Sequence, residues 1–72
     1  MRTFSLFIHS AASIVPMLLI DVFDDEAGAR ELAERALAES PGRLLAEVRE
    51  NDRLLFSVDR NGVTWIAHET GV

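Results

Sequence analysis

The sequence predicts a single α+β domain over residues 1–72, with the order β-β-α-β-β-β and one helix packed on a mainly antiparallel sheet. Three observations predict this fold class. Two turn signals, at 51–53 and 61–62, separate strand-like segments in the C-terminal half. An amphipathic helical pattern precedes them, and two apolar, strand-like segments precede the helix.

The first two strands are expected over 3–9 and 15–23, joined by a connection of small residues at 10–13. The first strand is indicated by the alternation of Phe4, Leu6 and Ile8, which has period two. In the second strand Pro16 lies near the beginning, where a missing backbone N–H is tolerated.

The run 4–23 contains Asp21 as its only charged residue, so a signal peptide and a membrane-spanning helix are alternatives to paired strands. Polar residues and Pro16 interrupt a membrane span. A signal peptide would have a compact apolar segment reaching only from Phe4 to Ile8. Paired strands are the preferred interpretation, although the sequence leaves open whether this run is a targeting segment.

The second expected strand is apolar on both faces, because Met17 and Leu19 alternate with Leu18, Ile20 and Val22. This pattern is typical of a central strand in a sheet that is covered twice. A single helix covers only one sheet face. We therefore expect the other face to carry an exposed apolar patch of the kind that marks an interaction site.

The helix is expected to begin at Asp24, a favourable N-cap residue, and to end at Ser40-Pro41-Gly42. Gly28 lies in its first turn, where we expect it to let a neighbouring backbone approach closely. The apolar stripe has the spacing of one helix face. It consists of Ala29, Leu32, Ala33, Ala36 and Leu37.

Asn61-Gly62 predicts a two-residue type I′ turn between the last two strands. This turn would pair Val58 with Trp65 and Phe56 with Ala67. Trp65 would then lie on the helix-covered face of the sheet together with Val58 and Phe56.

For the preceding hairpin, a three-residue loop at 51–53 is expected, with a non-glycine residue in the left-handed region. This loop pairs Val48 with Phe56 and Ala46 with Val58. A two-residue loop would slip the register by one residue and send apolar side chains to the wrong face.

On folding, a domain of 72 residues buries only about 60% of the surface of its unfolded chain, less than a larger domain does, and this chain has no cysteine for disulfides or thiolate metal sites. The absence of cysteine fits a reducing cytoplasm, which is the expected location. Oligomerisation is the remaining stabiliser, and we expect a homodimer. The predicted dimer face consists of Leu55, Ile66, Ser57, Met17 and Leu19.

The formal net charge is −5, and most of it belongs to the expected helix. This charge opposes general nucleic-acid binding, which depends on neutralising phosphates. An alternative function is nevertheless a nucleic-acid-binding or anion-binding domain that uses Arg49, Arg53 and Arg60, with Arg43 nearby. Solvated charges on a sheet are the ordinary interpretation of these residues.

Catalysis is not expected, because the sequence has no nucleophile motif, no glycine-rich phosphate loop and no lysine. A small metal-dependent enzyme is a third hypothesis. It would use His9 and His68, the only histidines, or the carboxylates near the helix start. Helix capping explains those carboxylates without a substrate, so no cofactor and no metal site are predicted. The carboxylates are Asp21, Asp24, Asp25 and Glu26.

The stretches 20–33 and 45–52 resemble small uncharacterised bacterial domains that combine a strand, an Ala/Arg/Glu-rich helix and a hairpin. The element order also resembles HicB-type antitoxin domains, which are partner-binding modules, but the glycine-rich N-terminal signals of that group are missing. The resemblance implies no activity. The sequence thus favours a non-catalytic, homodimeric interaction module that binds a partner protein and does not enter a membrane.

Overall fold

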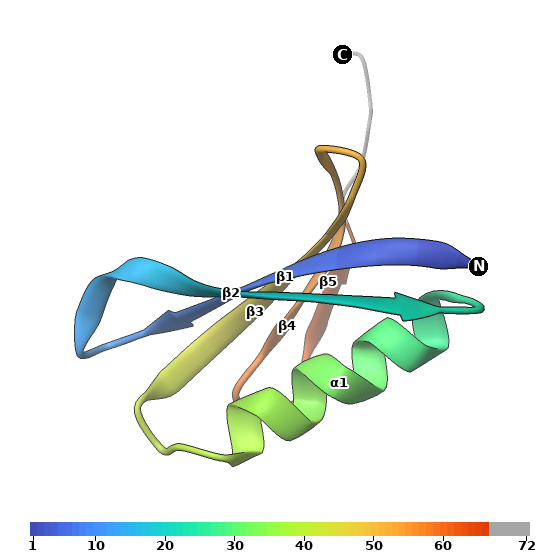
Figure 1. Cartoon of the computed structure of the whole chain (residues 1–72). Coiled ribbons are helices and arrows are strands. Elements are labelled where there is room, and N and C mark those ends of the chain that lie inside the picture. The colour runs from blue at the N-terminus through green and yellow to red at the C-terminus, as the bar shows by residue number, and fades with distance from the viewer. Residues whose placement is uncertain (67–72) are drawn as a thin grey trace, which may run out of the picture.

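The computed structural model describes residues 1–66, which form one helix packed on a five-stranded antiparallel sheet (Figure 1). The predicted order β-β-α-β-β-β is confirmed, and the strands lie side by side as β2-β1-β3-β4-β5. The elements are β1 (Arg2–Ser10), β2 (Ser13–Phe23), α1 (Glu26–Ala38), β3 (Arg43–Glu50), β4 (Arg53–Asp59) and β5 (Thr64–Ile66).

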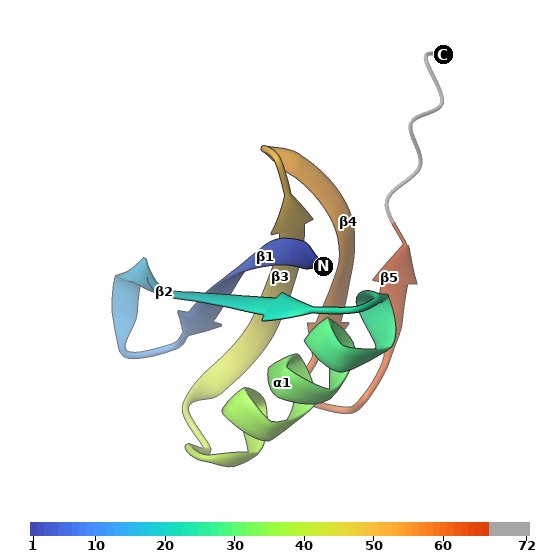
Figure 2. The ribbon, with the colours of Figure 1, turned by 45° about the vertical axis from the view of Figure 1, so that its right-hand side comes forward.

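The hydrophobic core lies between α1 and one face of the sheet. Figures 1 and 2 show α1 on this side only, and its packing is closest to β3 and β1. The alanines of the predicted stripe let the helix backbone approach the strands closely, while larger side chains from the sheet fill the space between. The core residues are Phe4, Leu6, Ile8, Ala29, Ala33, Ala36, Leu37, Ala46, Val48, Phe56 and Val58.

The start of α1 corrects two predictions. Asp25, rather than Asp24, is the N-cap residue, and its carboxylate accepts a hydrogen bond from the backbone N–H of Gly28 at 3.3 Å. At Gly28 an added Cβ would lie 2.7 Å from Phe23 Cδ1. It is therefore a side chain, not a backbone, that approaches this glycine. The Phe23 ring in turn packs at 6.1 Å from the ring of Phe4.

The β3–β4 hairpin has the predicted core register but not the predicted loop. Val48 pairs with Phe56 and Ala46 with Val58, as expected. The turn, however, has two residues, Asn51 and Asp52, with φ of 52° and 65°, as a type I′ turn requires. A β-bulge next to Val48 supplies the extra residue that the loop was expected to supply.

The β4–β5 hairpin shows the opposite outcome, because its loop has three residues instead of two. Gly62 N–H donates to Asp59 O at 3.0 Å, Asp59 N–H donates to Val63 O at 2.9 Å, and Gly62 has φ of 84°. A turn followed by a left-handed glycine is the usual form of a three-residue hairpin loop. The Asp59 carboxylate stabilises this loop by accepting from the N–H groups of Asn61 and Val63.

The longer loop shifts the register of β5 by one residue. Val58 pairs with Thr64, and Ser57 pairs with Trp65. The prediction that Trp65 lies in the core is therefore wrong, since its side chain is on the sheet face away from α1 and is 62% exposed. The predicted partner of Phe56, Ala67, lies outside the described residues.

The N-terminal ribbon of β1 and β2 confirms the preference for paired strands. The two strands pair from Arg2↔Phe23 to Ser10↔Ser13. Their turn projects beyond the end of α1 (Figure 1). Within residues 1–66, no helix has the length and apolar character that crossing a membrane would require. One expectation fails here: β2 is an edge strand and not a central one.

Candidate interaction surface

The outer face of β2, which points away from α1, carries a row of exposed aliphatic side chains. The register with β1 places Leu18, Ile20 and Val22 opposite Phe7, Ser5 and Thr3 on this face. The three side chains are 50%, 63% and 45% exposed. They form one contiguous row along the strand, because alternate residues of a strand share a face.

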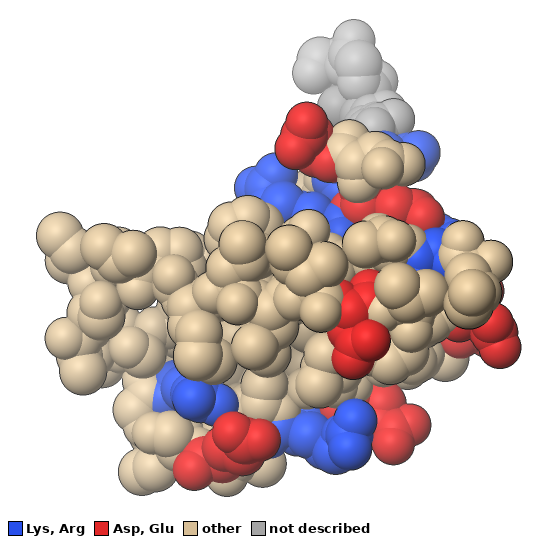
Figure 3. Space-filling view, in the orientation of Figure 1, with Lys and Arg blue, Asp and Glu red and all other residues tan. Residues whose placement is uncertain are grey.

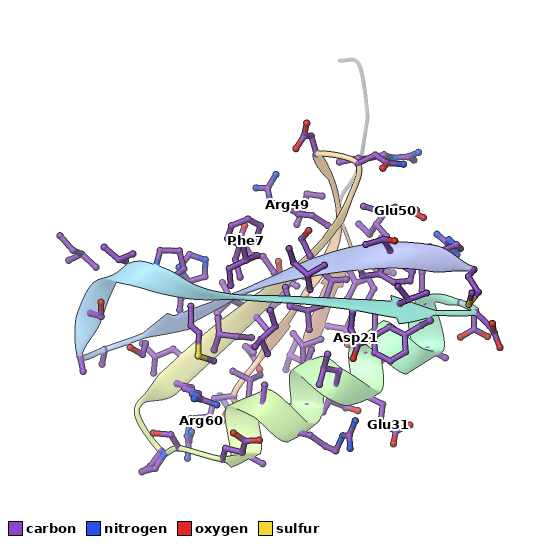
Figure 4. All side chains as sticks on the ribbon, viewed as in Figure 1. Phe7, Asp21, Glu31, Arg49, Glu50 and Arg60 are labelled. Atoms are coloured by element: carbon purple, nitrogen blue, oxygen red, sulfur yellow. The ribbon has the colours of Figure 1, made fainter. Side chains whose placement is uncertain are left out.

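The helix-side face of β2 is only partly covered. Leu19 packs against the core beside Leu6, whereas Met17 is 39% exposed. Asp21 is opposite Phe4 on this same side, where it is the single charge of the strand. It is exposed, and one carboxylate oxygen accepts from the N–H of Val22 at 2.7 Å. Figure 4 shows Asp21 on the α1 side of the strand.

The backbone of β2 also has an open side. Within residues 1–66 its only sheet neighbour is β1, so the N–H and C=O groups on its other side face no strand. We call this open backbone edge, together with Met17, Leu18, Leu19, Ile20 and Val22, the β2 edge surface. In Figure 3 uncharged atoms cover the left and most of the centre of the view, where β2 and its turn lie. One acidic side chain lies just right of the centre, where Figure 4 labels Asp21, and the other charged atoms are gathered toward the lower, upper and right margins.

A long, apolar edge strand is unusual in a soluble domain. Such an edge is a template for pairing with another chain, and proteins commonly blunt it with charges, prolines or a cover. On β2 the blunting residues are Asp21 and Pro16, which flank the apolar segment 17–20. The segment between them is left open.

The structure does not bring the five predicted dimer-face residues onto one face. Met17 and Leu19 lie on the helix side of β2, and Ile66 pairs with Phe56 on the helix side of β4. Ser57 lies on the outer face, opposite Glu47 and Trp65. Met17 and Leu19 thus belong to the β2 edge surface, while Ile66 is at the far side of the sheet.

Leu55 and Ile66 instead line a cavity of about 310 Å³ beside the first turn of α1. Leu55 is the residue that the β-bulge adds to β4, and it packs against the core. Thr64 also lines this cavity, and its Oγ1 is buried with no hydrogen-bond partner among the described residues. The remaining wall comes from Glu26, Ala27, Arg30 and Phe56.

Polar and charged pairs occupy the middle of the outer face, on β1 and β3. His9 Nε2 lies 2.6 Å from Glu47 Oε1, and Arg49 lies 3.6 Å from the other oxygen of Glu47. The guanidinium of Arg49 also stacks at 5.7 Å over the Phe7 ring. These contacts give the central strands a hydrated outer surface, in contrast to β2.

The arginines proposed for anion binding do not form a cluster. Arg49 and Arg60 lie at opposite ends of the sheet, as Figure 4 shows. Arg60 donates to the backbone oxygens of Ser40 and Arg43, so it ties the β4–β5 loop to the end of the helix. Arg53 is opposite Glu50 beside the Asn51-Asp52 turn. Arg49 and Arg53 are therefore near the β3–β4 turn, whereas Arg60 has a structural role at the β4–β5 loop.

Three of the four carboxylates near the helix start have separate partners rather than a shared site. Asp25 caps α1, Asp21 binds its neighbouring N–H, and Glu26 lies 3.4 Å from Arg2. In the described part of the chain, no group of three or more His, Cys, Asp or Glu residues is arranged to hold a metal ion. His68, the second histidine of the metal hypothesis, lies outside the described residues.

Arg2 and Glu50 form the best-aligned ion pair, which joins the beginning of β1 to the end of β3. The two hydrogen bonds from Arg2 to the Glu50 oxygens measure 3.0 and 2.8 Å. The guanidinium of Arg2 lowers the pKa of the Glu50 carboxyl, chiefly through these hydrogen bonds, although desolvation opposes the shift. The same contact raises the pKa of Arg2.

Leu18, Ile20 and Val22 were missing from the predicted site residues. Their signal was present, because the sequence shows a strand that is apolar on both faces, but that pattern was assigned to a central strand. Comparison with protein-family models, with characterised proteins and with solved structures finds no match to this chain. The resemblance to small bacterial domains therefore stays a prediction.

Proposed function

We propose that this protein is a non-catalytic interaction module that forms a homodimer through the β2 edge surface. The observation that carries the proposal is an edge strand of eleven residues whose side chains are apolar on both faces. Pairing of this edge with a second copy would satisfy the open backbone groups and bring the exposed aliphatic rows of the two copies side by side, which removes part of their surface from water.

Burial of apolar surface favours association of two copies. Removal of apolar surface from water contributes about 25 cal/mol per Å², and the exposed row on β2 consists entirely of aliphatic side chains. A chain of 72 residues has a small core and gains proportionally more from such burial than a large domain does. The hydrated outer surface of β1 and β3 offers no comparable gain.

The alternatives receive less support. The spread of Arg49, Arg53 and Arg60 over two ends of the sheet does not favour a nucleic-acid surface. Within residues 1–66, no group of three or more His, Cys, Asp or Glu residues is arranged to support a metal-dependent reaction. Binding of a further partner protein, and a cytoplasmic location, stay predictions.

Analytical ultracentrifugation of matched variants tests the proposal. Val22 and Val63 are both 45% exposed, but only Val22 belongs to the β2 edge surface. We expect the wild-type chain to sediment as a dimer at tens of micromolar. We expect Val22→Lys and Ile20→Lys to shift it to monomer, because each would place a lysine charge against aliphatic side chains of the second copy. Val63→Lys should leave the dimer intact.

Circular dichroism should show that all three variants keep the fold. A wild-type chain that is monomeric at every concentration up to a millimolar would overturn the proposed dimer. A dimer that is lost with Val63→Lys but not with the β2 variants would move the interface elsewhere.

A further inference from the structure

The strand β2 has one charged residue, Asp21, and a group of opposite charge, the Arg43 guanidinium, lies beside Met17, four positions away along the same strand. Asp21 projects on the helix side of β2. The guanidinium of Arg43, at the start of β3, reaches the same side of β2 at Met17, where its Nη2 lies 3.8 Å from the Met17 sulfur. A thioether is a weak acceptor, so this nitrogen keeps capacity for a stronger one.

We propose that two copies pair antiparallel along β2 with Leu19 on the two-fold axis, so that Asp21 of each copy forms an ion pair with Arg43 of the other. This inference rests on the proposed homodimer and specifies its geometry. A two-fold axis at Leu19 places residue 21 opposite residue 17 of the second copy. Directly opposed side chains of an antiparallel pair have Cβ atoms about 4.5 to 5.5 Å apart. Asp21 then meets the sulfur that already contacts the arginine.

Arg43 is held in position for this contact. Its Nη1 donates to the backbone oxygen of Ala36 at 2.7 Å and lies 3.3 Å from Glu39 Oε1. The side chain is about four-fifths buried, with 21% of it exposed. A guanidinium that is fixed by the end of α1 loses little conformational freedom when a carboxylate arrives.

The same register matches the apolar row on the outer face. It places Leu18 opposite Ile20 of the second copy, and Pro16 opposite Val22. Every outer-face position from 16 to 22 then meets an apolar partner. Since the two-fold axis is perpendicular to the sheet, both helices lie on one side of a continuous ten-stranded sheet.

Neighbouring registers lack this match. In an antiparallel pair the axis must pass through a residue, because opposed residues point to the same face. An axis at Asp21 would oppose the two carboxylates directly. An axis at Ile20 or Leu18 would place Asp21 opposite Leu19 or Val15 of the second copy, away from Arg43.

The decisive experiment measures the dimer dissociation constant of Asp21→Asn, with Asp24→Asn as the matched control. Both changes remove one negative charge, but Asp24 lies outside β2. We expect Asp21→Asn to weaken the dimer about five- to tenfold, through the loss of two symmetric ion pairs. Asp24→Asn should leave it unchanged. If Asp21 served instead to discourage edge pairing, Asp21→Asn would tighten the dimer, and the inference would be overturned.

Charge reversal provides a second readout. Asp21→Arg alone should weaken the dimer further, because it places two guanidinium groups together. The double variant Asp21→Arg with Arg43→Asp should recover part of this loss, since the pair is restored with exchanged charges. A double variant that is folded by circular dichroism but weaker than the sum of its single variants would contradict the pairing.

Cysteine cross-linking tests the register independently, because the natural chain has no cysteine. Under mild oxidation, Leu19→Cys should give more covalent dimer than Leu18→Cys or Ile20→Cys, since only residue 19 faces its own copy. If Leu18→Cys or Ile20→Cys gave the most covalent dimer, the proposed register would be overturned, although the proposed homodimer would still hold. A wild-type chain that is monomeric in the centrifuge would remove both proposals.

Discussion

The two faces of the sheet differ in how their apolar residues are covered. On the face toward α1, residues from β1, β3 and β4 are buried by helix residues of the same chain. On the outer face, the central strands carry ion pairs, whereas β2 carries exposed aliphatic side chains. The first face is completed within one chain, and the second is not.

This difference separates the residues that the fold needs from those that it does not use. Leu6 and Leu18 illustrate the point, because they lie on adjacent strands and on opposite faces. Leu6 is fully buried, and Leu18 is half exposed. Exposed apolar patches commonly mark interaction sites, and this row is the basis of the proposed dimer.

The largest expected effect comes from truncating these two leucines. Leu6→Ala should lower the free energy of unfolding by about 2 to 5 kcal/mol, through lost burial and a residual cavity. Leu18→Ala should change it by less than about 1 kcal/mol when it is measured below the dimer dissociation constant. Urea denaturation checks both values. Equal losses for the two variants would contradict the contrast between the faces.

A smaller effect is expected where β2 meets the helix. Gly28→Ala should lower the free energy of unfolding by about 1 to 2 kcal/mol, because the overpacking against Phe23 exceeds the gain in helix propensity. At Gly42 an added Cβ meets no atom within 4 Å. Gly42→Ala is therefore the control, and thermal unfolding should show little change for it. A stabilised Gly28→Ala variant would show that Phe23 moves away freely.

The smallest effect concerns the Arg2–Glu50 pair at the margin of the covered face. Because the folded chain lowers the pKa of Glu50 from its ordinary value of 4.5, the pair stabilises the fold above that pH. This stability is lost as the pH falls through the lowered pKa. Glu50→Gln should therefore be less stable than wild type at pH 7, and the difference should shrink toward pH 3.

Urea midpoints measured between pH 3 and pH 7 give the result. Glu31→Gln, at an exposed position of α1, is the control with the same charge change, and its difference from wild type should be smaller at pH 7. If the difference in stability between wild type and Glu50→Gln increased as the pH is lowered, the ion-pair assignment would be contradicted.

The two C-terminal hairpins show how far local patterns reach. The register of β3 and β4 was predictable, because a slip would have sent Val48 and Phe56 away from the core. The loop lengths were not. Asn51-Asp52 adopts the two-residue turn with the help of a bulge, and Asn61-Gly62 belongs to a three-residue loop stabilised by Asp59. Both solutions satisfy the same dipeptide preferences, so the dipeptides alone could not distinguish them.

The candidate site was predictable only in part. The sequence indicated that the second strand is apolar on both faces and that a second surface needs cover, and Met17 and Leu19 belong to that surface. Ile66 was assigned to it because the β5 register was wrong by one residue, and Leu55 because the β-bulge in β4 was not foreseen. Arg43 and Asp21 could not be connected at all, because they lie 22 residues apart in the sequence and the proposed ion pair depends on the strand order and on a second copy.

The sequence by itself determined the elements of this protein, because hydrophobic periodicity, capping residues and turn residues act within a few positions of one another. It determined the order β-β-α-β-β-β and the face that the helix covers. Only the tertiary structure decided that β2 lies at the edge of the sheet. Strand order depends on which long-range pairings bury the most apolar surface together, and no local pattern contains that information.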